Sequence, residues 1–367
     1  TRALELGFDA VGIAPAEPGE HLPFYLDWIA AGYHGDQAYL ARPDRLARRQ
    51  DLRVILPGVH SVVVVGMHYW PGPPSPEADD PARGRISCYA LGPDYHQVML
   101  SRLESLLDFI KSTVGGIVRG RAYVDTGPLL ERDHALSAGL GFVGKNCSLI
   151  RPGRGSWLFL GVLLLADCGP LEPGDTLSLP DCGTCTRCLE ACPTGALIQP
   201  RTLDSRRCIS YFTTSLRGAI PRDYRPLVKN HIFGCDVCQA VCPWNRFARP
   251  ADGRGVDPSA SAPPLLELIR LSEKEFEARY AGTAIGHIKR DRFLRNVAVA
   301  LGNWGSDDAV PSLGQALTRD PSWLLRGHAA WALGEIGNVR ARALLEKALE
   351  CESDPAVQTE IHLALNH

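Results

Sequence analysis

The residues of this sequence with the clearest chemistry are its cysteines. The strongest pattern is Cys182-Gly-Thr-Cys185-Thr-Arg-Cys188, which is followed by Cys192-Pro193. Three thiolates at C-x2-C-x2-C spacing wrap one face of a cubane iron–sulfur cluster, and a fourth cysteine followed by proline serves the other cluster in two-cluster ferredoxins. The spacing therefore predicts [4Fe–4S] chemistry, which is one-electron transfer at low potential.

A second run of cysteines ends in the same way but lacks one leading cysteine. Cys235-Asp-Val-Cys238 is followed by Cys242-Pro243, and Cys208 lies between the two runs and can supply the missing ligand. Two clusters need eight ligands, and eight are present. With the fourth ligands exchanged, one cluster takes Cys182, Cys185, Cys188 and Cys242, and the other takes Cys192, Cys208, Cys235 and Cys238. The alternative is structural zinc, which prefers paired C-x2-C units on four ligands.

The elements before the cysteine-rich segment mix strands and helices. The chain has 367 residues, which is enough for two or three hydrophobic cores. The apolar runs 61–66 and 157–165 predict buried strands, and residues 99–110 show helical periodicity. We therefore expect an α+β protein whose first domain, residues 1–170, has α/β character. Residues 171–250 form a ferredoxin-like module for the two [4Fe–4S] clusters.

Beyond a Pro- and Gly-rich linker the sequence repeats itself. Ala300-Leu-Gly302 recurs as Ala332-Leu-Gly334, an offset of 32 residues. A period of this size is typical of paired helices that stack, each unit burying its apolar face on the next. The spacing predicts HEAT-like helical repeats over residues 265–367, with an irregular helical bundle as the alternative.

Composition and charge exclude several classes of protein. Apolar residues make up 45% of the chain and charged residues 22%, which excludes a mostly disordered or fibrous protein. The longest strongly apolar run, 157–166, is too short to cross a bilayer. No secretion signal is visible, so we expect a cytoplasmic protein in which reduced cysteines serve as metal ligands. We also expect a monomer. The net charge of −2 means that any polyanion must be held by a local patch.

One acidic residue stands where a strand runs into a turn. Tyr123-Val-Asp125-Thr-Gly-Pro128 precedes a helical stretch, so Asp125 is either a helix cap or a proton donor that faces a pocket. A proton donor needs a pKa raised by burial. Asp133 is a weaker candidate, because it lies within the helical stretch, where a solvated face is usual.

A basic cluster opens the helical domain. Lys289, Arg292 and Arg295 follow helical spacing, and Arg290 lies beside them. We predict that Lys289, Arg290, Arg292 and Arg295 bind the phosphates of an RNA stem, with a solvated basic face as the alternative.

The order of motifs resembles that of the epoxyqueuosine reductases over nearly the whole chain. The resemblance rests on the eight cysteines and on the following segments: Gly32-Tyr-His-Gly-Asp36 with Tyr39-Leu40, Val124-Asp-Thr-Gly-Pro128 through Glu131-Arg132, Gly139-Leu-Gly-Phe-Val-Gly-Lys-Asn146, Cys208-Ile-Ser210-Tyr211 and Gly234-Cys-Asp-Val-Cys238. That family removes the epoxide oxygen of epoxyqueuosine in tRNA. The resemblance implies the same reaction on an anticodon stem-loop, with electrons passing from the clusters to cobalamin; it does not specify the electron donor.

The resemblance also implies roles for single residues. The family binds cobalamin, here expected as cob(II)alamin, without a protein ligand to cobalt. This agrees with Asp94-Tyr-His96, which begins like a cobalt-ligating motif but has methionine where the motif needs glycine. By motif match, Asp125 is the proton donor. The residues expected to border the corrinoid are Arg48, Cys88, Asp125, Arg151 and Ser210.

Two other functions compete with this one. A corrinoid reductive dehalogenase would share both cofactors, but it usually carries an export signal and needs no helical repeats. A non-enzymatic iron–sulfur electron carrier would explain the cysteines and the repeats, but it leaves residues 1–170 without a role.

Overall fold

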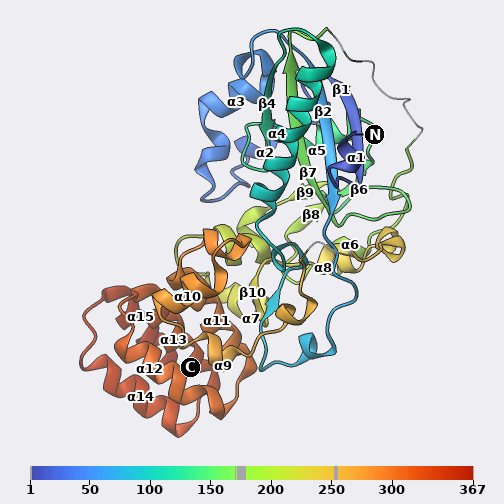
Figure 1. Ribbon diagram of the computed structural model, residues 1–367. Helices are drawn as coiled ribbons and strands as arrows, with labels where there is room; N and C mark the ends of the chain where they lie inside the picture. Colours follow the sequence, from blue (N-terminus) through green and yellow to red (C-terminus); the bar gives the residue numbers. More distant parts are fainter. Residues whose placement is uncertain (1, 170, 172–178, 252–254, 367) are drawn as a thin grey trace. The chain divides into compact units, whose positions relative to one another are not determined.

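The computed structural model describes residues 2–169, 171, 179–251 and 255–366 (Figure 1). Contacts divide the chain into two compact units. The first comprises Thr1–Gly72, Pro93–Arg206 and Val237–Val256, and the second comprises Pro73–Gly92, Arg207–Asp236 and Asp257–His367. The cysteine-rich segment 171–250, predicted as a module of its own, contributes to both units. No helix in the described ranges is long and apolar enough to span a membrane.

An antiparallel sheet forms the centre of the first unit. Its strand order is β1 (Ala10–Pro15), β2 (Val59–His68), β7 (Leu158–Ala166) and β4 (Arg119–Tyr123). The two predicted strands are confirmed: the run 61–66 lies within β2, and the run 157–165 overlaps β7 except at Trp157. These two strands are apolar on both faces, as expected for central strands covered on each side.

Helices cover both faces of this sheet (Figure 1). On one face, Val63 and Leu163 pack with Met99 of α4 (Tyr95–Val114), the helix predicted by periodicity. On the other face, Val64 and Leu164 share a core with α5 (Glu131–Ser137). Alternate residues of each strand point to opposite faces, so β2 and β7 bind a helix on each side. The packing of α5 on the sheet positions both ends of the loop between β4 and α5, which carries Asp125.

Shorter elements complete the first unit. The remaining helices are α1 (Arg2–Glu5), α2 (Leu22–Ala30), α3 (Pro43–Gln50), α6 (Arg187–Glu190) and α8 (Val237–Ala240). Two small strand pairs are β5 (Phe142–Val143) with β6 (Leu149–Ile150), and β8 (Leu197–Gln199) with β9 (Thr202–Leu203).

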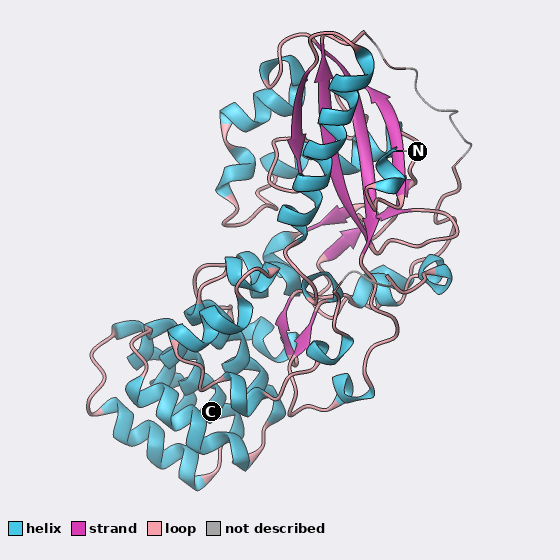
Figure 2. Ribbon diagram, in the orientation of Figure 1, coloured by secondary structure: helices cyan, strands magenta, loops and turns pink. Residues whose placement is uncertain are grey.

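The second unit is mostly helical (Figure 2). Strand β3 (Arg85–Ile86) pairs in parallel with β10 (His231–Phe233). The helices are α7 (Arg225–Val228), α9 (Leu265–Leu268), α10 (Glu273–Tyr280), α11 (Arg290–Trp304), α12 (Val310–Arg319), α13 (Trp323–Ile336), α14 (Val339–Leu349) and α15 (Pro355–Leu365). Helix α13 packs between α11 and α15, while α12 and α14 pack beside each other, so the predicted helical repeats are confirmed.

The recurring glycines explain the 32-residue period. A Cβ atom on Gly302 would lie 2.9 Å from the Cα atom of Ala332, and one on Gly334 would lie 2.9 Å from the Cα atom of Ala364. Glycine therefore lets each inner helix approach the next one closely, and the same contact recurs at the next repeat.

Candidate functional site

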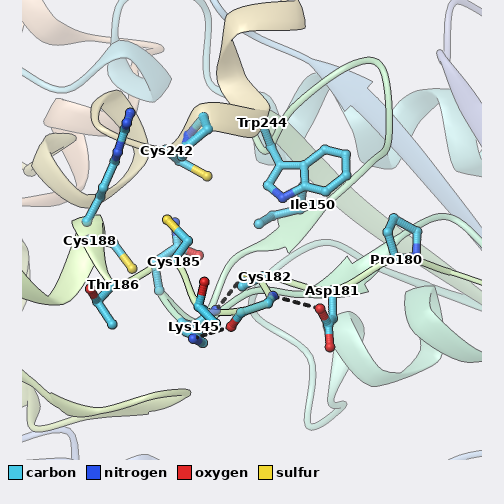
Figure 3. A pocket seen from close by; sticks show the side chains of 15 residues that line it. Lys145, Ile150, Pro180, Asp181, Cys182, Cys185, Thr186, Cys188, Cys242 and Trp244 are labelled. Atoms are coloured by element: carbon cyan, nitrogen blue, oxygen red, sulfur yellow. Dashed lines mark hydrogen bonds between the residues drawn. The ribbon is translucent and has the colours of Figure 1, made fainter.

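Four cysteines line one pocket in the first unit (Figure 3). Cys182 and Cys185 come from the turn that leads into α6, Cys188 lies in α6 itself, and Cys242 comes from the segment after α8. Their side chains surround a common space in the figure. The structure thus brings together the four cysteines that the sequence assigned to one cluster, three from one run and one from the other.

Local hydrogen bonds shape the turn that carries these thiols. Gly183 has a left-handed backbone (φ +49°), and its amide donates to Asp181 Oδ1 at 2.7 Å. The amide of Lys145 donates to Cys182 Sγ at 3.4 Å. Amide donors of this kind stabilise thiolate sulfur and tune the potential of a bound cluster.

Burial disfavours ionisation of two of these thiols. It raises the pKa of Cys188 and that of Cys242, so neither thiol ionises readily alone. Metal coordination deprotonates thiols and supplies the missing positive charge. The donor set therefore fits an iron–sulfur cluster.

The second predicted ligand set is divided between the units. Cys192 and Cys238 belong to the first unit, and Cys208 and Cys235 belong to the second. The amide of Ala196 donates to Cys192 Sγ at 3.2 Å. The assignment of these four cysteines to one cluster stays a prediction.

Asp125 lies in the loop after β4, and its side chain is 64% exposed. Its Oδ2 atom accepts a hydrogen bond from the Tyr95 hydroxyl at 3.0 Å and lies 3.4 Å from His96 Nε2. The residue does not cap a helix, because α5 begins after Leu130. The alternative role of helix cap is therefore wrong.

The expected raised pKa of Asp125 depends on burial against the corrinoid and stays a prediction; the contacts with protein groups alone lower that pKa. The hydrogen bond with His96 is the main cause that lowers the pKa of Asp125, and the bond from Tyr95 acts in the same direction. Burial alone would lower the pKa of His96, but its hydrogen bonds to Asp125 and Asp94 raise it. His96 Nδ1 lies 2.7 Å from Asp94 Oδ1, so Asp94 orients the ring. These hydrogen bonds therefore favour the protonated form of His96 and the ionised form of Asp125.

Glu131, the first residue of α5, belongs to a segment that carries the family resemblance, but sequence reasoning assigned it no role. Its Oε1 atom accepts a hydrogen bond from the amide of Asp125 at 2.7 Å. Burial raises the pKa of Glu131 to about 8, with a further contribution from the Asp125 carboxylate. The available signal was its place six residues after Asp125, at the start of the helix.

Asp133 does not lie on a solvated face, so that expectation is wrong. Its side chain is buried, it accepts from the amide of His21 at 3.1 Å, and its Oδ1 atom lies 2.7 Å from His21 Nδ1. It is engaged in a contact of its own, separate from the hydrogen bonds around Asp125.

The residues expected to border the corrinoid lie in both units. In the first unit, Arg48 extends from α3 with its Nη1 atom 3.8 Å from Asp44, and Arg151 Nη1 donates to the carbonyl of Asp9 at 2.7 Å. In the second unit, burial and the nearby Asp236 carboxylate raise the pKa of the Cys88 thiol. Ser210 precedes the π-helical turn Tyr211–Ser215. Their contact with a corrinoid stays a prediction.

The predicted basic face is wrong for two of its four residues. Arg295 is fully buried, and its guanidinium donates to the carbonyls of Phe212, Leu216 and Gly218. Arg290 donates to Asp320 Oδ2 at 2.7 Å and to a backbone carbonyl, and only 13% of its side chain is exposed. Neither guanidinium is available to a phosphate. Lys289 is exposed and Arg292 is half-buried, so RNA binding by these two stays a prediction.

Arg295 instead holds the chain between two predicted cluster ligands. The carbonyls that Arg295 binds follow Cys208 in the chain. The neighbouring Asn296 donates to the carbonyl of Thr213 at 2.8 Å and to that of Ile232, which lies three residues before Cys235, at 2.9 Å. A buried guanidinium is costly unless its N–H groups find hydrogen-bond acceptors, and here the carbonyls provide them. Helix α11 therefore supports the cysteine-bearing segment of the second unit.

We expect Arg295→Met to lower the free energy of unfolding by about 3 kcal/mol or more, because three buried carbonyls lose their donor. Denaturant titration measures the effect. Arg342→Met is the control: Arg342 pairs with Glu346 on an exposed helix face, where such pairs contribute little. Equal stability of the two variants would contradict a structural role for Arg295.

Four thiols around one pocket fit an iron–sulfur cluster, and the second unit contains stacked helical repeats. The class defined by fold and site is therefore an iron–sulfur protein with a helical repeat domain. Three family profiles match in agreement with this class. They are the 4Fe-4S double cluster binding domain over residues 181–245, Epoxyqueuosine reductase QueG, DUF1730 over residues 49–126, and HEAT repeats over residues 289–366.

Similar proteins identify the family. The chain is 42% identical over 337 residues to the epoxyqueuosine reductase of Pseudomonas aeruginosa, covering 91% of this chain and 92% of that one. It is 39% identical to the Escherichia coli enzyme, with coverage of 94% and 90%. A crystal structure of epoxyqueuosine reductase with an epoxyqueuosine-modified tRNA-Tyr stem loop matches with a TM-score of 0.90 at 33% identity, covering 99% and 96% of the two chains. The chain belongs to the epoxyqueuosine reductase family, and it is an oxidoreductase whose cofactors are two [4Fe–4S] clusters and cobalamin.

Proposed function

We propose that this chain removes the epoxide oxygen of epoxyqueuosine in a tRNA anticodon stem-loop to give queuosine, and that it does so in the cytoplasm. Family membership over nine-tenths of the chain supports the reaction, and the tRNA stem loop in the solved relative supports the substrate. The observation that carries the proposal is the Asp125 carboxylate, exposed at the sheet edge and hydrogen-bonded by Tyr95 and His96.

The donor chemistry of this chain fits cobalamin bound without a histidine ligand to cobalt. His96 is the histidine of the truncated motif, and both of its ring nitrogens already face carboxylates, those of Asp94 and Asp125. Bound cobalamin supplies the reducing electrons to the substrate, and the protein supplies position and protons.

The residues around Asp125 provide the proton. Loss of the epoxide oxygen as water consumes two electrons and two protons, so an acid must face the departing oxygen. A substrate that covers the exposed carboxylate removes water from it, which favours its protonated form. His96 Nε2, 3.4 Å away, is the neighbouring group from which Asp125 takes that proton. A crystal structure of the Bacillus subtilis relative, with a TM-score of 0.87 and 32% identity, records a catalytic aspartate loop swung out of the active site, which supports a catalytic loop here.

A comparison of two substrates tests this function against reductive dehalogenation. The protein, loaded with both cofactors and a chemical reductant, is incubated with an epoxyqueuosine stem loop or with a halogenated phenol. We expect loss of one oxygen from the tRNA nucleoside by mass spectrometry and no release of halide. Halide release without any change in the tRNA would replace the proposal by the dehalogenase alternative.

The exposed end of the basic cluster provides a test of RNA binding. Replacing both Lys289 and Arg292 with glutamate is expected to weaken binding of the stem loop and to reduce its salt dependence, because phosphate contacts release counterions. The charge-matched control replaces Arg340 and Arg342, both exposed on α14, with glutamate. Fluorescence anisotropy at several salt concentrations measures both. Equal weakening by the two pairs would indicate a general charge effect and reject this surface.

A further inference from the structure

The backbone of Asp125 is held in an uncommon conformation. Its φ of +58° lies in the left-handed region, which costs roughly 1–2 kcal/mol for most residues and less for aspartate. The loop therefore needs contacts that fix it. One comes from α3, where Arg45 Nη1 donates to the carbonyl of Thr126 at 3.0 Å. The other comes from α5, where Glu131 Oε1 accepts from the amide of Asp125 itself at 2.7 Å.

Glu131 is half-buried at the start of a helix that packs on the core of the first unit. Helix α5 packs on the central sheet through Ala135, which is fully buried. This packing places the Glu131 carboxyl within hydrogen-bond distance of the Asp125 amide, whereas the Asp125 side chain itself is exposed.

We propose that Glu131 is a positioning residue for the reaction: its Oε1 atom holds the amide of Asp125 so that the Asp125 carboxyl faces the substrate. This inference rests on the proposed function, in which Asp125 supplies the proton. Misplacing a reacting group by about 1 Å can cost on the order of 10²-fold in rate, so one fixed hydrogen bond has a large effect on turnover.

The hydrogen bond must be distinguished from an effect of charge. The charged and titratable groups near Glu131 are Asp125, Arg132, His96 and Arg49. Glutamine keeps an acceptor oxygen at the same place without an acidic group. Methionine keeps the length of the side chain but offers no strong acceptor, so it preserves packing better than alanine does. The pair of variants therefore separates the acceptor from the carboxyl group.

Two readouts test the proposal on the full chain with both cofactors. We expect Glu131→Met to lower kcat about 10-fold to 100-fold with little change in KM, and Glu131→Gln to stay within about threefold of the unchanged protein. Hydrogen–deuterium exchange, measured without substrate, should show faster exchange of the loop amides 124–128 in Glu131→Met only, because the hydrogen bond from the Asp125 amide to Glu131 is lost. Ser137→Ala is the control on the same helix, because Ser137 is exposed, and it should change neither kcat nor loop exchange.

The outcomes separate this inference from the proposed function. In the double variant with Asp125→Asn, Glu131→Met should cause no further loss, because both act on the same proton transfer. An equal loss of kcat in the Met and Gln variants would show that the carboxyl group itself is needed. No loss of kcat in either variant would show that the hydrogen bond between Glu131 and the Asp125 amide has no role in turnover. Either result overturns the inference. Full activity of Asp125→Asn alone would instead overturn the proton-donor role on which the inference rests.

Discussion

Replacing Asp125 with asparagine is expected to lower turnover by about 10²-fold or more, the usual scale for losing a general acid. Asparagine keeps the shape and tolerates the left-handed backbone of this position (φ +58°), but it has no acidic proton. The variant should therefore still bind cobalamin, both clusters and the tRNA stem loop. Rapid-quench kinetics with mass analysis of the nucleosides measures the effect.

The control for this variant is Asp133→Asn. Asp133 is the other acid that the sequence offered, but its carboxyl is buried against His21. We expect normal turnover per folded molecule in the control. If Asp133→Asn lost turnover while Asp125→Asn kept it, the proton donor would be Asp133.

Removing Cys242 is expected to abolish one of the two clusters and with it the electron supply. Cys242→Ala should reduce the iron content from about eight to about four atoms per chain, since a cubane loses its fourth thiolate. Anaerobic metal analysis measures the iron. Cys351→Ala, which removes an exposed cysteine outside both runs, should leave the iron unchanged. Stoichiometric zinc with little iron in the unchanged protein would contradict the cluster assignment.

A double variant tests the exchange of ligands between the runs. Cys182 and Cys242 line the same pocket, so the double variant Cys182→Ala with Cys242→Ala should still hold about four iron atoms. If each run served its own cluster, the same double variant would damage both clusters and lose nearly all of its iron. The iron content thus distinguishes the two ligand schemes directly.

Features coded by local spacing could be predicted from the sequence. The apolar runs in β2 and β7 predicted the central strands, because a strand buried on both faces needs consecutive apolar residues. The 32-residue period predicted the repeats, because Gly302 and Gly334 make the same close helix contact. The cysteine spacing also placed Cys242 with the first run, as the pocket shows.

Features that depend on distant partners could not be predicted. Arg295 has the spacing of a basic helix face, but its partners are carbonyls about 80 residues earlier in the chain. The pKa of Asp125 depends on its hydrogen bond with His96, which lies in the first turn of α4, 29 residues earlier in the chain. The contact of Glu131 could not be predicted because its partner is the backbone amide of Asp125, which the residue types do not indicate.

A single-turnover reaction tests the central claim most directly. The protein, reduced and loaded with both clusters and cobalamin under anaerobic conditions, is mixed with a limiting amount of epoxyqueuosine stem loop, and the nucleosides are analysed by mass spectrometry. The account predicts conversion to queuosine by the unchanged protein and about 10²-fold slower conversion by Asp125→Asn. Unaltered epoxyqueuosine after incubation with the fully loaded, unchanged protein would contradict it.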